Sequence, residues 1–315
     1  MIKGTYIFYE DGKEICRSEN VITRFGKRFL TNFIAGNTSF RNKDIALGIG
    51  SNAATELDTK LQFEFYKAPV SFGSIDIQWN ESLSTYTYTV IYSAKIPSSV
   101  TGLIKEVGLY PLGESSETFY SDQVLNSFDD QTEWTNAGVS ASISPLYSRI
   151  GPTTVYWSTT GNTSKEYKYS MNVKDMSGYS VNDTIALSIY QADNYLNKIR
   201  VKFYSSDTEY YYIDLTPNST TGYDIPFSLL TNLFTNKVGL PEISRINQIG
   251  IETFPESGQD TTVYFDGLRI NDEDTYDVNY GIISRSVLAS ALNKIAGRSV
   301  DIEYRLQLSW QKSFR

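Results

Sequence analysis

The stretch "TTVYFDGLRI", residues 261–270, decides the fold, because it has the pattern of a buried strand with one carboxylate in its middle. Apolar residues stand on both sides of that carboxylate, Asp266; they are Val263, Phe265, Leu268 and Ile270. A buried carboxylate without a partner costs several kcal/mol. Asp266 therefore needs a partner, and the neighbouring residues offer an ion pair with Arg269 or a lysine, or a turn before Gly267 that Asp266 caps.

Short alternating segments with polar turns surround this stretch over residues 119–272. The alternating segments are "TTVYWSTT", "KEYKYSMNV", "DTIALSIYQ", "KIRVKFYS", "EYYYIDL" and "INQIGIETF". Between them "VNDT", "SSDT" and "PNSTTG" supply residues that favour turns. Strands at a spacing of roughly 8–15 residues with such turns predict an antiparallel β-sandwich or jelly roll. The segment "IPFSLLTNLFTNKVGLP" is expected to be a helical or irregular insertion.

Residues 1–118 predict a smaller unit of mixed structure. Asp11-Gly12 stands between two strand-like segments, which predicts a hairpin. A helix over 23–35 follows, with Thr23 as its N-terminal cap and Gly36 at its end. The motif "ALGIGS" has two glycines of a dinucleotide-binding loop, but the third glycine and a long βαβ unit are missing. We interpret it as a turn.

The C-terminal segment, 273–315, predicts one helix and one strand. In "SRSVLASALNKIAG" the apolar residues follow helical spacing over 286–296, and Gly297 stands after the end. "SVDIEYRLQLSW" alternates as a strand does. Two such elements are too small for a core of their own, so we expect them to pack against residues 1–118. The predicted fold class is mainly β: a small α+β attachment domain, 1–118 plus 273–315, with an inserted antiparallel β-sandwich of the jelly-roll type over 119–272.

Composition narrows the classes of function. Histidine is absent, which removes His-based triads, His metal sites and His general bases. The single cysteine, Cys16, excludes an internal disulfide and is interpreted as a small packing residue. A net charge of −8 disfavours nucleic acid as a partner, and no apolar run approaches the roughly 20 residues that span a bilayer. We expect no catalytic residues, no enzymatic activity, no nucleic-acid partner and no membrane insertion.

The order of motifs in the outer segments resembles the N-terminal domain of bacteriophage tail-fibre, collar and baseplate-associated proteins. The motifs are "ENVITRFGKRFLTNFIAG", "IALGIGSNAATELDTKLQFEFYKAPV" and "AKIPSSVTGLIKEVGLY", and "IEYRLQLSW" is similar to the closing strand of the same unit. Lys67 stands where such proteins often carry arginine. The resemblance implies a virion protein of the phage tail or neck that is made in the host cytoplasm. Its implied partners are other tail, baseplate or neck proteins and further copies of itself in a closed homo-oligomer.

The middle segment resembles a jelly roll of the carbohydrate-binding-module type, which is usually non-catalytic. "VLNSFDDQTEWT" is similar to the opening strand of such modules and "TVYFDGLRI" to the closing one. The resemblance implies that the first and last strands lie side by side, and that oxygens there hold a structural Ca²⁺. Asp129 or Asp130, together with Asp266, match those regions. Calcium prefers six to eight oxygen ligands, and an ion between two acids would remove the cost of burying Asp266. The turn cap and the ion pair remain the alternatives.

The same resemblance implies sugar recognition by aromatic rings that stack on pyranose faces. Tyr210 and Tyr212 share one face of a strand, because side chains along a strand alternate. The full set of candidate residues for glycan stacking is Trp134, Trp157, Tyr190, Tyr210 and Tyr212. The alternative for each is packing in the core or across strands. If these rings cluster on the surface, the predicted ligand is a host surface polysaccharide.

These observations predict a structural protein of a phage tail: a short fibre, an adaptor or a baseplate component. Its attachment domain would dock on the tail scaffold through the helices at 23–35 and 286–296 and the strand edges near Gly48–Gly50 and Gly108. A first alternative is a neck or head-fibre decoration protein with a purely architectural sandwich. A second is a polysaccharide-degrading tail spike. That reaction needs two paired carboxylates, and no spacing in the sequence singles out such a pair.

Overall fold

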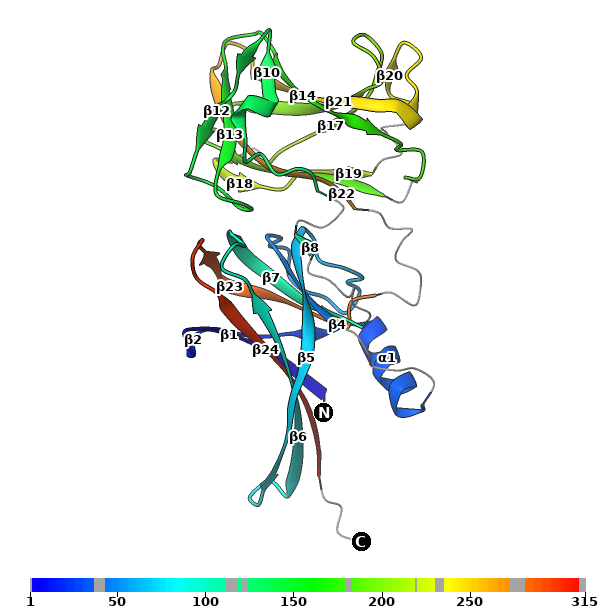
Figure 1. Ribbon diagram of the computed structural model, residues 1–315, viewed down its shortest axis with the longest axis vertical. Coiled ribbons are helices and arrows are strands. Elements are labelled where there is room, and N and C mark those ends of the chain that lie inside the picture. Colours follow the sequence, from blue (N-terminus) through cyan, green and yellow to red (C-terminus); the bar gives the residue numbers. More distant parts are fainter. Residues whose placement is uncertain are drawn as a thin grey trace. The chain divides into compact units, whose positions relative to one another are not determined.

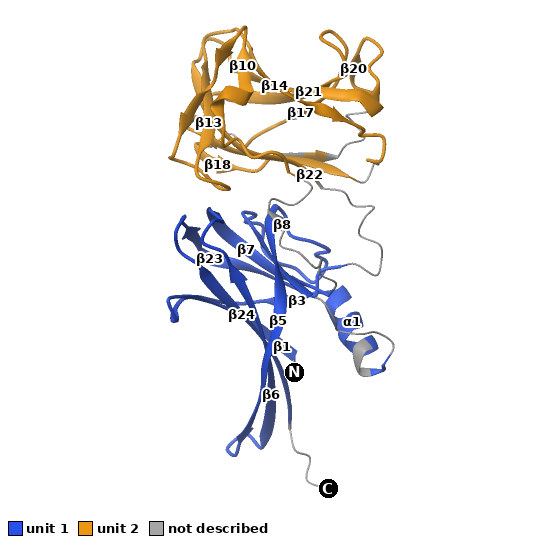
Figure 2. Ribbon diagram, in the orientation of Figure 1, with its two compact units in different colours: residues 1–122, 276–315 blue, residues 123–275 orange. Residues whose placement is uncertain are grey.

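The computed structural model describes residues 2–36, 43–111, 118–119, 124–179, 183–218, 220–229, 235–271 and 281–311. The chain divides into two compact units (Figure 2). Unit 1 comprises Met1–Asp122 and Tyr276–Arg315, and unit 2 comprises Gln123–Thr275. The predicted insertion, 119–272, differs from unit 2 by a few residues at each end. Over the described ranges, none of the helices has the length and apolar character that a membrane crossing requires.

The described residues of unit 1 form one ten-stranded antiparallel sheet and one helix, α1 (Arg24–Ile34). The strand order is β2-β1-β24-β6-β5-β4-β7-β23-β3, and β8 pairs with β5 (Figure 1). The bounds are β1 Ile2–Glu10, β2 Lys13–Glu19, β3 Val21–Ile22, β4 Lys43–Gly48, β5 Glu64–Asn80, β6 Thr85–Ile96, β7 Gly102–Tyr110, β8 Thr118–Phe119, β23 Ser284–Lys294 and β24 Val300–Gln311.

The two ends of the chain meet in this sheet. β24 pairs with β1 on one side and with β6 on the other. Tyr6 of β1 lies opposite Tyr304 of β24, and their buried rings have centroids 4.8 Å apart. β23 pairs with β7 and β3. The C-terminal segment therefore completes the core that the N-terminal segment begins, and the predicted fold class is confirmed.

Two local predictions in unit 1 are confirmed by the backbone. Asp11 and Gly12 have φ angles of 51° and 74°, the left-handed conformation that a tight two-residue hairpin requires. The Thr23 hydroxyl accepts a hydrogen bond of 2.9 Å from the amide of Gly26, which caps the start of α1.

The predicted helix over 286–296 is wrong, because this segment forms strand β23. The helical pattern would bury Ala291 and Ile295 on one face, yet both are exposed, and Ile295 is 46% exposed. Tertiary contacts decide the outcome. Within the predicted helix, the Ser286 hydroxyl donates to the Glu19 carbonyl at 2.7 Å, and the buried Lys294 ammonium donates to the Val100 carbonyl at 2.8 Å. An extended backbone brings both side chains to these partners, and this outweighs local helix propensity.

The two glycines of "ALGIGS" make room for a buried carboxylate, that of Glu106. A Cβ atom at Gly48 would lie 2.4 Å from a carboxylate oxygen of Glu106, and one at Gly50 would lie 2.5 Å from it. The Glu106 carboxylate accepts hydrogen bonds from the amides of Gly50, Gln62 and Phe63. Gly48, Gly50 and Gly108 are all buried. They are therefore core positions and not the docking edges that the sequence predicted.

Unit 2 is a β-sandwich of two seven-stranded antiparallel sheets. Sheet I has the order β12-β13-β22-β15-β18, with β19 beside β15 and β9 beside β22. Its bounds are β9 Val124–Asn126, β12 Ser142–Ser144, β13 Thr154–Thr159, β15 Thr184–Gln191, β18 Gly222–Asp224, β19 Phe227–Leu229 and β22 Thr261–Asn271. Sheet II has the order β11-β10-β14-β21-β16-β17-β20. Its bounds are β10 Trp134–Asn136, β11 Val139–Ser140, β14 Lys165–Lys174, β16 Leu196–Tyr204, β17 Tyr210–Leu215, β20 Lys237–Val238 and β21 Ile246–Pro255.

The insertion predicted over "IPFSLLTNLFTNKVGLP" falls partly outside the described residues, at 230–234. Its described parts include the short strands β19 and β20. The described residues of unit 2 also form two short 3-10 turns, Gln131–Glu133 and Ile243–Arg245.

The core of unit 2 lies between the two sheets and contains both tryptophans that the sequence offered for sugar stacking. Trp134 is 0% exposed and Trp157 is 3% exposed. Trp157 stacks on Phe265 with centroids 4.2 Å apart, and Trp134 stacks on Phe128 at 4.8 Å. Strand alternation turns both rings inward, so neither presents a face to a ligand. The assignment of Trp134 and Trp157 to glycan binding is therefore wrong.

Candidate functional site

Asp266 of the opening stretch lies in β22, at the centre of sheet I, and is 2% exposed. Asp266 follows the core residue Phe265, so strand alternation turns its carboxylate to the outer face of the sheet. The pairing of β22 with β15 shifts register after Asp266, and Gly267 has a φ of 54°; this bulge returns Leu268 and Ile270 to the core. One carboxylate oxygen, Oδ2, accepts hydrogen bonds from the amides of Arg149 and Ile150. The other, Oδ1, is buried and has no hydrogen-bond partner among the described residues.

A second carboxylate, that of Asp129, flanks the same turn. It lies against Gly151, where a Cβ atom would come within 2.2 Å of its oxygen. Ile150, the preceding residue, donates to Asp266. β9 pairs with β22 (Asn126 opposite Leu268), so the first and last strands of unit 2 lie side by side, as the resemblance implied.

Burial raises the pKa of the Asp266 carboxyl well above its usual range. Hydrogen bonds from the amides of Ile150 and Arg149 oppose the rise in this pKa, and the negative charge of Asp129 adds to it. No lysine or arginine of the described ranges forms an ion pair with Asp266. A bound cation would give the buried Oδ1 of Asp266 a partner and would offset the repulsion between Asp266 and Asp129.

Asp130 does not belong to this pair. Its exposed carboxylate accepts from the amide of Thr132 at 2.8 Å and from the Thr132 hydroxyl at 2.6 Å, which caps the turn Gln131–Glu133. Of the two acids that the resemblance offered, Asp129 is the one that acts on Asp266, and we call Asp129 and Asp266 the acid pair. In the part of the chain that the structure describes, three or more Asp, Glu or Cys residues do not gather in a group that could hold a metal ion.

Four tyrosines form a row across the outer face of sheet I, one on each of four neighbouring strands. Tyr156 of β13 pairs with Tyr264 of β22, Tyr264 with Tyr190 of β15, and Tyr190 with Tyr223 of β18. We call these four residues the tyrosine row. The rings of Tyr156 and Tyr264 stack with centroids 4.7 Å apart, and Tyr190 meets Tyr223 edge to face at 4.8 Å. Tyr223 is 43% exposed, and the other three rings are partly exposed.

The segment 147–151 connects the tyrosine row with the acid pair. Tyr147 stacks on Tyr190 with centroids 3.7 Å apart and has a φ of 67°, a conformation that costs a non-glycine residue about 1 kcal/mol or more. The Arg149 guanidinium lies 3.3 Å from the centroid of the Tyr223 ring. The Arg149 and Ile150 amides hold Asp266. One short segment thus supplies an aromatic ring, a cation and the donors for the buried carboxylate.

Of the five aromatic residues predicted for glycan stacking, only Tyr190 lies in the tyrosine row. Tyr210 and Tyr212 lie on the outer face of sheet II, where the Arg200 guanidinium covers Tyr212 at 4.1 Å and the Lys202 ammonium lies 5.0 Å from the Tyr210 ring centroid. Lys202 also bridges Glu166 and Glu252, at 3.0 and 2.9 Å. This face is a network of paired charges packed on rings.

Sequence reasoning missed the other residues of the tyrosine row, although a signal was present. In "VYW", 155–157, and "VYF", 263–265, a tyrosine stands between two core residues. Strand alternation turns the middle residue outward in both segments. The pairing of the two strands, which places Tyr156 beside Tyr264, could not be derived from the residues alone.

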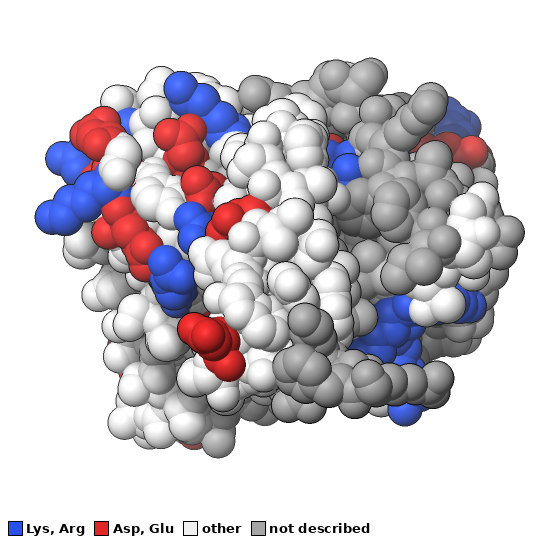
Figure 3. Space-filling model, turned by 90° about the horizontal axis from the view of Figure 1, so that it is seen from below, with Lys and Arg blue, Asp and Glu red and all other residues white. Residues whose placement is uncertain are grey.

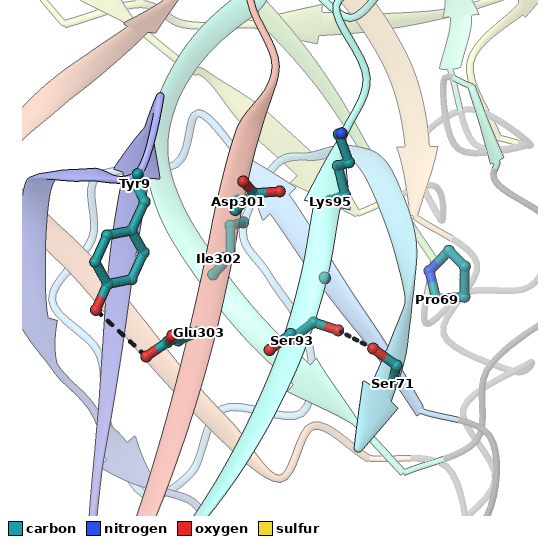
Figure 4. Close-up of a pocket in the computed structure, with 10 residues that line it drawn as sticks. Tyr9, Pro69, Ser71, Ser93, Lys95, Asp301, Ile302 and Glu303 are labelled. Atoms are coloured by element: carbon teal, nitrogen blue, oxygen red, sulfur yellow. Dashed lines mark hydrogen bonds between the residues drawn. The ribbon is translucent and has the colours of Figure 1, made fainter. Parts of the chain in front are cut away.

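Unit 1 contains a separate hollow of about 580 Å³ (Figure 4). It lies between β1, β24, β6 and the middle of β5. Some of its polar groups have partners: the Tyr9 hydroxyl donates to Glu303 at 3.3 Å, and the Ser71 hydroxyl donates to the Ser93 carbonyl at 3.2 Å. Arg305 donates to the same Glu303 carboxylate at 2.7 Å. Two charged residues, Lys95 and Asp301, also line the hollow (Figure 4).

No protein-family model and no curated protein matches the chain. Similar solved structures include the family 11 carbohydrate-binding module from Clostridium thermocellum in complex with a beta-1,3-1,4-mixed-linked tetrasaccharide (17% identity, 47% of this chain and 94% of that chain covered, TM-score 0.35). A family 30 carbohydrate-binding module of a Clostridium thermocellum cellulosomal cellulase has 15% identity, coverage of 49% and 95%, and a TM-score of 0.32. An exo-beta-agarase has 12% identity, coverage of 48% and 25%, and a TM-score of 0.36. Similarity at this level carries no conclusion about a ligand.

Proposed function

We propose that unit 2 binds an oligosaccharide or polysaccharide across the tyrosine row. The observation that carries this proposal is the placement of four tyrosines, one per strand, in a cross-strand row on the outer face of sheet I. Three strand spacings give the row a length of about 14 Å. Phenol rings offer a flat apolar face with a hydroxyl at the rim, and a sugar ring offers the matching apolar face with hydroxyls around it. A row suits an extended chain of sugars better than a single sugar.

Arg149 and Tyr147 pack on two rings of the tyrosine row, Tyr223 and Tyr190, and add a guanidinium and a further phenol to this surface. The guanidinium of Arg149 is a planar donor that can bond two hydroxyls or a carboxylate of an acidic sugar. Its stacking on Tyr223 fixes its plane next to the row. Tyr147 is held over Tyr190 in a conformation that is unfavourable for a non-glycine residue. Such strain is typical of binding loops, where it positions a side chain before the ligand arrives.

Replacing Tyr264 by alanine is expected to weaken glycan binding by roughly 30-fold, because truncating an aromatic residue at the centre of an interface costs about 2 kcal/mol. A bacterial glycan array with the full chain identifies a ligand, and calorimetry with that ligand measures the loss. Tyr210→Ala is the matched control, because Tyr210 lies on the opposite sheet. Equal affinities of Tyr264→Ala and the wild type, or an array without any ligand, would refute the proposal.

We further propose that the acid pair Asp129 and Asp266 holds a structural Ca²⁺. The unpartnered, buried Oδ1 of Asp266 supports this, as does the position of Asp129 on the same turn. Two carboxylates do not supply six to eight oxygens, so backbone carbonyls or water would complete the shell. The ion would offset the burial that raises the pKa of Asp266.

Removing calcium with EDTA is expected to lower the melting temperature of unit 2 by about 5–10 °C in the full chain. Free calcium at 100 times its Kd stabilises the folded state by about 2.7 kcal/mol, which in a unit of this size corresponds to a few degrees per kcal/mol. Differential scanning calorimetry measures the shift. Asp266→Asn should abolish the response to EDTA, whereas Asp130→Asn should retain it. A wild-type melting curve that EDTA leaves unchanged would exclude the ion.

The setting that we propose is a phage virion in which unit 1 attaches to tail, baseplate or neck proteins and unit 2 contacts host glycans. The motif order of unit 1 supports this, as does the return of the chain to unit 1 after the sandwich. The protein would be made in the host cytoplasm, assembled as a homo-oligomer, and would not act as an enzyme. A cryo-EM reconstruction of the intact particle tests the assignment. Unit 2 seated on the scaffold with unit 1 pointing outward would contradict it.

A further inference from the structure

Three strands of unit 1 continue beyond the core that they help to form. They are the outer half of β5 (residues 71–80), the first half of β6 (85–92) and the end of β24 (305–311). Figure 1 shows β5 and β6 running away from the rest of unit 1 as a long hairpin, with β24 alongside. Residues 71–80 of β5 pair only with β6 among the described residues.

One face of this three-stranded extension is entirely apolar or aromatic. Strand pairing places three rows side by side, each with one residue from β5, β6 and β24. The rows are Ile75, Val90 and Leu306; Ile77, Tyr88 and Leu308; and Trp79, Tyr86 and Trp310. We call these nine residues the apolar face. The opposite face carries polar residues, among them Asp76, Gln78, Thr87, Gln307 and Ser309.

The apolar face is open to solvent toward its outer end. Ile75 is 57% exposed, Ile77 55%, Trp79 43% and Trp310 48%. An aromatic side chain buries roughly 150–250 Å² when covered, so the face presents on the order of 500 Å² of apolar surface. A patch of this size is at the upper end of what a monomer leaves uncovered, and larger patches mark interaction sites.

A second copy of the same chain is the occupant that this face fits. It carries no charged side chain, so two identical faces can meet without opposing like charges. It also offers no ion or directed polar group, apart from two tyrosine hydroxyls, with which it could select a different protein. Figure 3 views the molecule from below and shows a broad area without Lys, Arg, Asp or Glu next to charges of both signs. Two such faces bury on the order of 1,000 Å² together, which reaches the lower bound of a specific interface.

We propose that the apolar face of β5, β6 and β24 is the self-association surface through which copies of this chain form a homo-oligomer. When two apolar faces pack against each other, their interface is continuous with the core of unit 1, because Leu306 and Tyr304 of β24 already belong to that core. The inference deepens the proposed virion role by locating the oligomer interface. It does not depend on glycan binding by unit 2.

The test is the molar mass in solution, measured by size-exclusion chromatography with light scattering at micromolar concentration. We expect the wild-type chain to elute as an oligomer and Ile77→Lys to elute as a monomer, because the substitution places charges at the centre of the interface. Trp310→Ser, on a different strand, should also weaken association. Gln78→Lys adds the same charge one residue away, on the polar face, and should leave the oligomer intact. Amide exchange of β1 and β23 confirms that each variant is folded.

The outcomes separate the two proposals. A wild-type monomer would overturn the interface, and so would oligomers that survive both Ile77→Lys and Trp310→Ser. Dissociation by Gln78→Lys as readily as by Ile77→Lys would also overturn it, because the effect would then follow from charge alone. A monomer that still binds glycan would refute the interface and leave the proposed function of unit 2 standing. An oligomer that binds no glycan would refute the proposed function of unit 2 and leave the interface standing.

Discussion

Replacing Glu106 by alanine is expected to lower the free energy of unfolding of unit 1 by about 3–5 kcal/mol, the usual cost of removing one partner of a buried ion pair. Glu106 is 0% exposed and lies 2.8 Å from the guanidinium of Arg285, which is 3% exposed. Its loss leaves Arg285 with the more exposed Asp58 as its remaining carboxylate, at 2.9 Å. It also removes the acceptor for three backbone amides, those of Gly50, Gln62 and Phe63.

Urea titration of amide hydrogen exchange, resolved by peptide, measures this loss separately in each unit. Exchange should rise throughout unit 1 and stay unchanged in unit 2. Glu56→Ala is the matched control, since the Glu56 carboxylate pairs with Lys27 on the exposed surface and its removal should have no measurable effect. Equal free energies of unfolding for the two variants would show that the Glu106 carboxylate does not stabilise unit 1.

Replacing Trp157 by alanine is expected to destabilise unit 2 by about 3–5 kcal/mol, because a large buried ring leaves a cavity when it is removed. Trp157 stacks on Phe265 at 4.2 Å and on Tyr167 at 4.6 Å. Its indole N–H donates a hydrogen bond of 3.1 Å to the Thr253 hydroxyl. Near-UV circular dichroism during urea unfolding measures the loss.

Trp157→Phe provides the comparison, because it keeps an aromatic ring against Phe265 and gives up only part of the volume and the indole N–H. Its loss should be clearly smaller than that of the alanine variant. The pair of variants also separates a packing role from a binding role. A ligand-stacking tryptophan would leave stability unchanged in both variants and abolish glycan binding in Trp157→Ala, which the burial of this ring argues against.

Much of the fold could be predicted because its signals are local. The hairpin at Asp11-Gly12, the cap at Thr23 and the alternating strands of the sandwich depend on neighbouring residues, and the structure contains all of them. The β23 segment shows where local signals fail. Its apolar spacing fits a helix, but Ser286 and Lys294 meet Glu19 and Val100, which are far away in the chain.

The candidate site residues also divide into those that local sequence reveals and those that depend on strand pairing across the sheet. Asp266 was identified because a carboxylate stands in an apolar strand. Asp129 or Asp130 was implied by the resemblance of their segment to the opening strand of a jelly-roll module, and only the structure singles out Asp129. Tyr190 was identified, but its partners in the tyrosine row come from three other strands whose order is set by the whole sheet. Trp134 and Trp157 were misassigned because size and aromaticity do not reveal which face of a strand points inward.

The pairing of β1 with β24 determines the order in which the protein matures on the ribosome. Of the two partners of β1, β2 follows it directly, whereas β24 is synthesised only after the described strands of the sandwich are complete at residue 271. At about 5–20 residues per second, the 153 residues of unit 2 (Gln123–Thr275) separate the two parts of unit 1 by roughly 8–30 s of translation. Nascent chains released before Ser284 should therefore carry a folded sandwich behind an unfolded, chaperone-dependent leading segment.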